Sequence, residues 1–322
     1  MTSIEQHIPV LTREAILALQ VRKSGAYLDA TFGRGGHSAK IIEELGVEGS
    51  LVAFDRDPTA IEQAQTRYAD DDRVSIHHAD FAQIRKLVAA DGSIDGVLMD
   101  LGVSSPQLDD AERGFSFMRD GPLDMRMDTS KGESARDWLA RVAESDLVKV
   151  LFELGEERFA RRIARAIITA RDAAPLASTL ELAAIVESAT PKKDRHKHPA
   201  TRTFQAIRLH VNQELEQISA ALPEAVRLMA PKARLVIISF HSLEDRIVKR
   251  FMRNYAKPKL PPIQVPTTER DYETPLRLIG KAQKPTAAEI DQNPRSRSSV
   301  LRVAERTEMD VARLSEWEAT HA

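Results

Sequence analysis

The sequence predicts an α/β fold in which a parallel sheet is interrupted by a helical insert. Two observations support this prediction. From residue 25 onward, short runs of β-branched and apolar residues alternate with helical patterns, as expected of β-α units that feed a parallel sheet. The fifth strand-like run then follows the fourth after about 130 residues, far more than a crossover connection needs.

Four strands and the helices between them are expected before this gap. The strands are expected at Tyr27–Thr31, Leu51–Asp55, Val74–His77 and Gly96–Asp100. The helices are expected at about His37–Leu45, at Pro58–Tyr68 and at Phe81–Ala89. Proline suits the first turn of the second helix, because the amide hydrogen that it lacks would have no partner there.

The gap itself divides into a loop and a helical part. Residues Ser105–Lys131 contain the glycine and aspartate typical of loops. Apolar residues at helical spacing then predict helices at Ala135–Val142, Ser145–Leu154, Arg158–Asp172 and Thr179–Ser188. A helix at Thr203–Ile218 is expected to lead back to the sheet. These elements predict a sheet domain of residues 1–104 and 200–322 and an inserted helical domain of residues 105–199.

The chain after the gap is expected to complete the sheet. Ala233–Phe240 is predicted as the fifth strand and Leu243–Tyr255 as a helix. Lys257–Pro266 is too rich in proline for either. Leu276–Lys281 and Ser299–Glu305 are predicted as two late strands that form an antiparallel ribbon at the sheet edge.

Composition narrows the class of protein. The 322 residues include 46 basic and 48 acidic side chains and no cysteine. A chain without cysteine has neither disulfides nor thiolate metal sites, which favours a reducing compartment. No apolar run approaches the length of a membrane span, and the first residues have no signal-peptide pattern. We therefore expect a cytoplasmic protein.

A glycine-rich turn predicts a nucleotide-like ligand. The first strand runs into Gly33-Arg34-Gly35-Gly36-His37-Ser38, where missing side chains allow a ligand to approach the backbone. Asp55 follows Gly33 by 22 residues, the spacing at which a carboxylate binds the ribose hydroxyls of an adenosine-containing cofactor. The alternative is that any tight turn between strand and helix favours glycine.

The nature of the cofactor depends on the residues around this turn. Ser38 stands where a dinucleotide-binding motif has its third glycine, which argues against NAD. Class I methyltransferases use a looser glycine turn and a further acid after the third strand, which Asp80 supplies, with Phe81 beside it to pack on adenine. The histidines nearby lack a carboxylate cluster at ligand spacing, so no metal site is expected.

Asp100 marks the expected reaction centre. It ends the fourth strand and is followed by Leu101-Gly102-Val103-Ser104-Ser105-Pro106-Gln107, which places polar groups at the carboxyl edge of the sheet. Methyltransferases that act on exocyclic amines carry a polar-Pro-Pro-aromatic motif here, and this chain lacks it. Asp100 and Ser104 offer acceptors of the same kind for an amine.

Taken together, these segments resemble the bacterial RsmH (MraW) family. The resemblance spans nearly the whole chain, up to Arg302. The matching blocks are residues 7–11, 29–38, 100–107, 114–117, 124–128, 202–208, 211–215, 239–246 and 293–298.

The resemblance implies a Rossmann-like class I S-adenosylmethionine-dependent methyltransferase with an inserted helical domain for substrate recognition. It implies methylation of the N4 amine of a cytidine in 16S ribosomal RNA near the decoding site, with the assembled small subunit as the partner. The catalytic residue would be Asp100. The cofactor-binding residues carried over are Gly35, Gly36, His37, Asp55, Phe81, Asp100 and Gln107.

Basic clusters suggest where RNA binds. The residues predicted to bind RNA are Lys192, Lys193, Arg195, Arg202, Arg295 and Arg297. A further six basic residues lie between residues 246 and 259, a stretch without an acid. Such clusters neutralise phosphates, although each is also compatible with an ordinary solvated surface.

Two other functions compete with RNA methylation. The first is an NAD-dependent oxidoreductase, which the missing third glycine disfavours. The second is a non-catalytic ribosome-assembly factor that has kept the fold, which the joint presence of Gly35, Gly36, Asp55 and Asp100 disfavours.

Overall fold

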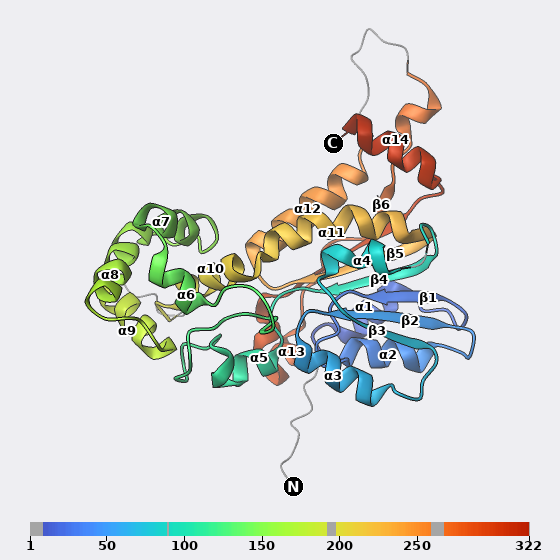
Figure 1. The fold of residues 1–322 in the computed structure, drawn as a ribbon. Helices are drawn as coiled ribbons and strands as arrows, with labels where there is room; N and C mark the ends of the chain where they lie inside the picture. The colour runs from blue at the N-terminus through green and yellow to red at the C-terminus, as the bar shows by residue number, and fades with distance from the viewer. Residues whose placement is uncertain (1–8, 89, 192–197, 259–266, 322) are drawn as a thin grey trace. The chain divides into compact units, whose positions relative to one another are not determined.

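The computed structural model describes residues 9–88, 90–191, 198–258 and 267–321 (Figure 1). The chain divides into two compact units. The sheet unit comprises residues 1–102 and 215–322, and the helical unit comprises residues 103–214. The helical unit is therefore an insertion that follows the fourth strand in the sequence.

The sheet unit is built on a seven-stranded sheet in the order β3-β2-β1-β4-β5-β7-β6 (Figure 1). β1 to β5 are parallel to their neighbours, whereas β7 is antiparallel to both β5 and β6. The predicted Rossmann-like sheet and its antiparallel ribbon are confirmed. The strands are β1 (Ala26–Asp29), β2 (Ser50–Asp55), β3 (Val74–His78), β4 (Ile94–Asp100), β5 (Met229–Ser239), β6 (Leu276–Leu278) and β7 (Val300–Arg306).

Each face of the sheet buries a separate apolar core. Leu28 belongs to one core and its neighbour Tyr27 to the other, and Met99 and Leu98 divide in the same way. This alternation follows from the two-residue period of a strand, and both faces are apolar because helices cover both. The helices of the sheet unit are α1 (Thr12–Leu19), α2 (Gly36–Glu44), α3 (Pro58–Arg67), α4 (Ile84–Leu87), α11 (Glu214–Leu228), α12 (Ser242–Tyr255), α13 (Ala287–Gln292) and α14 (Val311–His321). None of the described helices is long and apolar enough to span a membrane.

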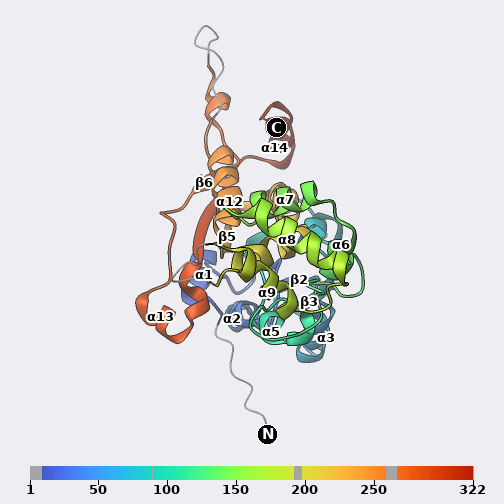
Figure 2. The same ribbon diagram turned by 90° about the vertical axis from the view of Figure 1, so that its left-hand side faces the viewer.

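The helical unit has its own core. Its helices are α5 (Ser105–Asp109), α6 (Ala135–Arg141), α7 (Glu144–Glu153), α8 (Ala160–Ala173), α9 (Thr179–Ala189) and α10 (Thr201–Asn212). α7, α8 and α9 pack in sequence (Figure 2). α10 contacts α6 and α7, which gathers the apolar faces around one core. α9 begins at a capping box in which the Ser178 hydroxyl accepts from the Glu181 amide and the Glu181 carboxylate accepts from the Ser178 amide.

The predicted return helix at residues 203–218 is wrong. The structure has two helices there, α10 and α11, which are separated at Gln213 with φ at 49°. The apolar face of α10, which includes Phe204 and Ile207, is buried in the core of the helical unit. The chain therefore returns to the sheet unit at residue 215 and not at residue 200, where the sequence placed the boundary.

A C-terminal helix that the sequence did not predict completes the sheet unit. Leu314 and Trp317 of α14 are buried in the same core as the apolar residues of α11 and α12. Glu318 accepts a hydrogen bond of 2.9 Å from the Tyr255 hydroxyl at the end of α12 and is ion-paired with Arg227 of α11. α14 thus ties the two preceding helices together.

Candidate active site at the carboxyl edge of the sheet

Three neighbouring strands of the sheet unit end in acids. Asp29 ends β1, Asp55 ends β2 and Asp100 ends β4. The order β2-β1-β4 puts them next to each other, because parallel strands share a carboxyl edge. Ligands of open α/β sheets bind at this edge, so it is the candidate active site.

The glycine turn after β1 is shaped by the chain's own packing. A side-chain carbon on Gly35 would lie 2.5 Å from the Phe32 ring, and one on Gly36 would lie 2.5 Å from Cγ of Pro9. Gly35 also has φ at 71°, in the left-handed region that favours glycine. From the sequence, we expected glycine at these positions because a ligand approaches the backbone. The structure gives another reason, since a side chain at either position would collide with Phe32 or Pro9. Their contact with a cofactor stays a prediction.

Asp55 is oriented by two backbone amides. Gly33 N–H donates to Oδ2 at 2.6 Å and Asp57 N–H donates to Oδ1 at 2.8 Å. Burial raises the pKa of this carboxyl group, and the two amide donors partly oppose the shift. Since each carboxylate oxygen has two lone pairs, both oxygens can accept a further hydrogen bond. This is the geometry needed to bind a pair of ribose hydroxyls.

Asp29 is the most deeply buried of the three acids. It is 1% exposed, and it accepts hydrogen bonds from the Ser38 hydroxyl at 2.6 Å and the Thr31 amide at 3.1 Å. Burial raises the pKa of its carboxyl group to about 6, even though these donors favour the charged form. Ser38, which stands at the third position of the glycine motif, therefore has a structural partner in β1.

Asp100 is paired with a buried histidine. His37 Nε2 lies 3.0 Å from the Val10 carbonyl, which can only accept, so Nε2 carries the hydrogen. The other ring nitrogen, Nδ1, faces Asp100 Oδ2 at 3.6 Å.

The other oxygen of Asp100 is a buried acceptor. Oδ1 is buried and has no hydrogen-bond partner among the described residues, although a quarter of the whole side chain is exposed. Burial raises the pKa of the Asp100 carboxyl well above its usual value, and the charges of Asp29 and Glu244 add to the shift. A buried acceptor without a donor is costly, so a ligand with a positively charged donor would be stabilised here.

Sequence analysis missed the polar groups at the end of β5 as site residues. The Ser239 hydroxyl is buried and, within the described ranges, has no hydrogen-bond partner. Glu244 is fully buried, accepts from the amides of Phe240 and His241, and lies 3.1 Å from His241 Nε2. The signal was available in the run Ser239-Phe240-His241-Ser242, in which a polar residue ends the apolar strand and two more follow within three residues.

The remaining predicted cofactor residues are placed as follows. Phe81 begins the short 3-10 helix Phe81–Gln83 and is half-buried against the core. Asp80 before it is paired with Arg56 at 3.1 Å. Gln107 belongs to the helical unit, where it is buried and its side chain accepts from the Ser104 amide at 3.0 Å. That bond forms half of the capping box of α5.

The predicted RNA-binding residues that the structure describes belong to both units. Arg202 lies at the start of α10 and donates to the Glu156 carbonyl at 3.3 Å. Arg295 and Arg297 are exposed on the 3-10 helix Pro294–Ser298. Lys192, Lys193 and Arg195 lie outside the described residues. Within the described part of the chain, no group of three or more His, Asp or Glu is placed to hold a metal ion.

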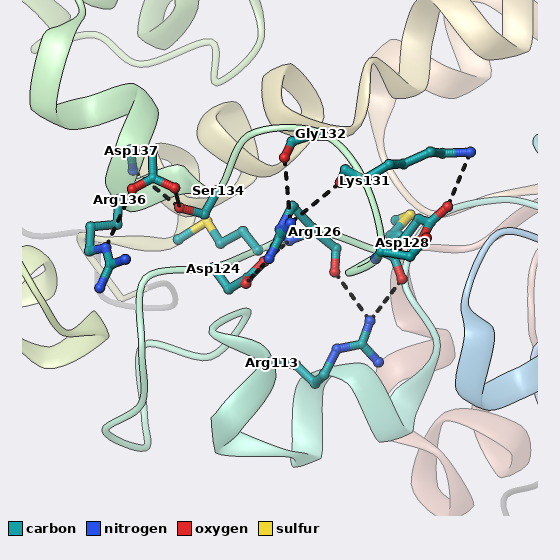
Figure 3. Close-up of polar contacts among 12 residues, drawn as sticks. Arg113, Asp124, Arg126, Asp128, Lys131, Gly132, Ser134, Arg136 and Asp137 are labelled. Atoms are coloured by element: carbon teal, nitrogen blue, oxygen red, sulfur yellow. Dashed lines mark hydrogen bonds and ion pairs between the residues drawn. The ribbon is translucent and has the colours of Figure 1, made fainter.

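A second polar cluster lies in a loop of the helical unit (Figure 3). Arg126 pairs with Asp124 through two hydrogen bonds, from Nε at 2.8 Å and from Nη2 at 2.7 Å. Asp128 accepts from the Ser130 hydroxyl at 2.6 Å and pairs with Lys131 at 3.1 Å. Burial and these donors act in opposite directions on the pKa of Asp128, and the net shift is downward. The loop is therefore held by charge-assisted bonds.

The backbone of the same loop is fixed by two side chains. Arg113 donates to the carbonyls of Arg126 and Met127 at 3.1 and 2.9 Å (Figure 3). Asn212, at the end of α10, donates to the Met125 carbonyl and accepts from the Met127 amide, both at 2.7 Å. Met125 has φ at 60°, an unfavourable value for a residue with a side chain. These bonds stabilise the strained conformation.

Comparison with known proteins settles the family. The MraW methylase family matches residues 4–307. The chain belongs to the MraW methylase family. The predicted family and the predicted methyltransferase are confirmed, and the oxidoreductase alternative is excluded.

Individual relatives agree with this membership. The ribosomal RNA small subunit methyltransferase H of Alteromonas mediterranea is 56% identical over 306 residues, which cover 94% of this chain and 97% of the relative. An rRNA methylase from Streptococcus thermophilus is 10% identical with a TM-score of 0.41, covering 95% of this chain and 99% of that one. The N-methyltransferase NodS from Bradyrhizobium japonicum is 10% identical with a TM-score of 0.40, covering 92% and 94%. Structural similarity at this level adds no argument about the chain.

The first prediction for this MraW methylase concerns Asp29. Its carboxyl group has a raised pKa in the folded state, so between about pH 4 and 6 the folded protein binds more protons than the unfolded chain. Its contribution to stability is therefore present at low pH and is lost as pH rises through 6. Through Asp29, the free energy of unfolding of the wild type should rise by about 1.3 kcal/mol as pH falls from 7 to 5. Asn at this position cannot titrate, so we expect Asp29→Asn to lack this rise.

Urea unfolding at pH 5, 6 and 7 measures this difference. The signal is the fluorescence of Trp317, which is buried in the sheet unit, in a Trp138→Phe background. Asp70→Asn is the control, because Asp70 is exposed. Parallel pH dependences for wild type and Asp29→Asn would show that Asp29 is not the titrating group.

The second prediction concerns Asn212. Asn212→Asp replaces a donor to two carbonyls, those of Met125 and Arg208, with a buried carboxylate. We expect a loss of roughly 3 kcal/mol or more in the stability of the helical unit, because a buried charge is left without a compensating partner.

Trp138 reports this loss, since it is buried in the helical unit. In a Trp317→Phe background, its fluorescence should show a lower urea midpoint for Asn212→Asp. The control Asn254→Asp, at an exposed position of α12, should differ from wild type by about 0.5 kcal/mol or less. A wild-type midpoint for Asn212→Asp would contradict the role of Asn212 in fixing the loop.

Proposed function

We propose that this protein transfers a methyl group from S-adenosylmethionine to the N4 amine of a cytidine in 16S ribosomal RNA near the decoding site. Family membership supports the methyl transfer, and the 56% identical relative is named a ribosomal RNA small subunit methyltransferase. The sequence blocks that resemble the RsmH family support the choice of base and atom. The assembled small subunit is the proposed partner.

The observation that carries the proposal is the uncompensated acidic edge. Asp29, Asp55 and Asp100 end adjacent strands, burial raises the pKa of each carboxyl group, and the hydrogen-bond donors to Asp29 and Asp55 are neutral. S-adenosylmethionine carries a sulfonium, an ammonium group and a ribose diol. An edge of this kind suits a cationic ligand with hydroxyl groups better than it suits an anionic dinucleotide.

The residues of the sheet unit divide the work of binding. Asp55, fixed by the amides of Gly33 and Asp57, accepts from the ribose hydroxyls. Phe81 packs against the adenine, and the turn at Gly35 and Gly36 places the backbone beside the cofactor. His37 is 5% exposed, so we assign it to positioning Asp100 in preference to direct contact. Gln107 is proposed as a contact from the helical unit.

Asp100 is the proposed catalytic residue. S-adenosylmethionine supplies an electrophilic methyl group, and the attacking amine must present its lone pair in line with the bond that breaks. The lone pair of a cytosine amine is delocalised into the ring. A carboxylate that accepts a hydrogen bond from the amine favours its rehybridisation. Ser239, whose buried hydroxyl has no hydrogen-bond partner among the described residues, is a second candidate acceptor at the same edge.

The helical unit is the proposed substrate-recognition domain. Its loop 124–128 is held rigid by Arg113, Asn212 and two acid–base pairs, as expected of a surface that positions a substrate. Arg202 belongs to the same unit, whereas Arg295 and Arg297 are exposed on the sheet unit. We assign these arginines, with Lys192, Lys193 and Arg195, to RNA binding.

The test of the function is methyl transfer to a defined position. Small ribosomal subunits from cells that lack the protein are incubated with the purified protein and S-adenosylmethionine. Mass spectrometry of the digested 16S RNA should then show one N4-methylated cytidine near the decoding site. Methylation of another atom, or of naked RNA with assembled subunits left unmodified, would contradict the proposal.

The third prediction concerns Asp55. Asp55→Asn replaces one acceptor oxygen with a donor that faces a backbone amide, and it removes the charge that strengthens bonds from the ribose. We expect affinity for S-adenosylmethionine to fall about tenfold or more, since each hydrogen bond to a charged group contributes roughly 1.5 to 3 kcal/mol. Calorimetric titration measures it, with exposed Asp70→Asn as the control. An unchanged dissociation constant in a folded variant would remove Asp55 from the site.

The fourth prediction concerns Asp100. Its pKa is raised in the free protein, and a cationic ligand favours its charged form, so cofactor binding should release protons and strengthen as pH rises. Titrations at pH 5 to 8 in buffers of different ionisation enthalpy measure this release. S-adenosylhomocysteine, which lacks the sulfonium charge, should release fewer protons. Asp100→Asn should abolish the difference.

Kinetics of the same variant separate the two possible roles of Asp100. A larger loss of cofactor affinity than of kcat would place the carboxylate at the ammonium group, and the reverse would place it at the target amine. We expect both to fall, with affinity falling more. Wild-type values for both would show that the reaction centre lies elsewhere.

A further inference from the structure

Helix α12 has two chemically opposite faces. Val248 and Met252 are buried in the core, with Ile247, Phe251 and Tyr255 packed beside them. On the opposite side, at positions i, i+3, i+4 and i+7, four exposed basic residues follow one line along the helix. We call this line the basic stripe of α12: Arg246, Lys249, Arg250 and Arg253.

The acids of α12 do not neutralise the stripe. Glu244 is fully buried and holds the turn after β5. Asp245 pairs with Arg302 of β7 through bonds of 2.6 and 3.0 Å. Both are therefore engaged away from the exposed face, so the stripe is a local excess of positive charge on a chain whose net charge is −2.

Surface cations on three other helices of this protein are paired with acids. Lys40 of α2 pairs with Glu43, Arg227 of α11 with Glu224, and Arg313 of α14 with Glu316, each at i,i+3. Lys249, Arg250 and Arg253 have no hydrogen bond or ion pair within the described ranges. Exposed arginines without an ion pair within the described ranges also occur on α8, at Arg161 and Arg162. The stripe of α12 is distinguished by its place on the unit that carries the acidic edge.

The position of the stripe matches the needs of an RNA substrate. α12 begins directly after the carboxyl end of β5, so the stripe and the acidic edge belong to one unit. Acids at the edge repel phosphates while they favour a cationic cofactor. A row of cations that starts about one helical turn from His241 holds the backbone of a strand whose base enters the edge.

We propose that the basic stripe of α12 binds the sugar–phosphate backbone of the RNA that the protein methylates. The inference rests on the proposed function and adds a binding surface to it. The ligand is the phosphate backbone and not a particular base, because arginine and lysine on an exposed helix face recognise charge without reading sequence.

The test compares two variants that lose the same charge. The stripe variant carries Lys249→Gln, Arg250→Gln and Arg253→Gln. The control variant carries Lys23→Gln, Arg67→Gln and Lys86→Gln, three exposed residues that precede the amino ends of β1, β3 and β4. Binding to a labelled fragment of 16S RNA and to small subunits is measured across about 50 to 250 mM KCl.

The stripe variant should lose about two units of the slope of log affinity against log salt, because each phosphate contact contributes roughly 0.7 to 0.9. At about 100 mM KCl its affinity should fall at least about tenfold. Affinity for S-adenosylmethionine and kcat at saturating subunits should match wild type. The control variant should keep the wild-type slope.

Three other results would contradict the proposal that the stripe binds RNA. If the stripe variant and the control variant show the same slope while methylation proceeds normally, the stripe does not bind RNA and the proposed function stands. If the stripe variant binds the RNA fragment normally but loses affinity for assembled subunits, the stripe contacts a ribosomal protein instead. If unaltered protein neither binds nor methylates subunits, the proposed function fails and the stripe proposal fails with it.

Discussion

The structure of the sheet unit depends on holding three carboxyl groups together at one edge. Strands in a sheet lie about 4.8 Å apart, so acids that end adjacent strands repel one another and lose solvation as well. Neutral hydrogen-bond donors offset part of this repulsion and lost solvation. The amides of Gly33 and Asp57 donate to Asp55, and the Ser38 hydroxyl donates to Asp29. Neutral donors orient the acids without cancelling their charge. The edge therefore remains receptive to a cation.

This constraint explains local features that otherwise look unrelated. The turn at Gly33 delivers an amide to Asp55, and the same turn begins α2, which carries His37 and Ser38 to Asp100 and Asp29. The sheet unit also separates its charges, with acids at the strand ends and cations on the exposed side of α12. A cationic cofactor and an anionic polymer can then be bound by one unit without competing for the same surface.

The sequence predicted the sheet well because its signals are local. Strand periodicity, the proline that begins α3 and the two late strands each depend on a few neighbouring residues, and every predicted strand is present. The break at Gln213 gave no signal, because a left-handed residue that is not glycine is stabilised by its surroundings. The apolar face of α10 suits either unit, so the boundary of the insert depends on tertiary packing.

The candidate site was predicted in part for the same reason. Asp55 and Asp100 end apolar strands, so their positions in the sequence were enough to predict them as site residues. The need for glycine at positions 35 and 36 arises from the Phe32 ring and from Pro9. The ring of Phe32 is close in sequence, but its orientation is not visible there. The unpartnered hydroxyl of Ser239 likewise depends on what surrounds it in three dimensions.

Helix α14 lies beyond residues 4–307, the part of the chain that matches the family. It nevertheless buries Trp317 against Tyr255 and holds the far end of α12 through Glu318. A segment outside these matched residues thus fastens a helix that lies within them. Loss of α14 would therefore expose the Tyr255 ring and leave the last turn of α12 free to fray.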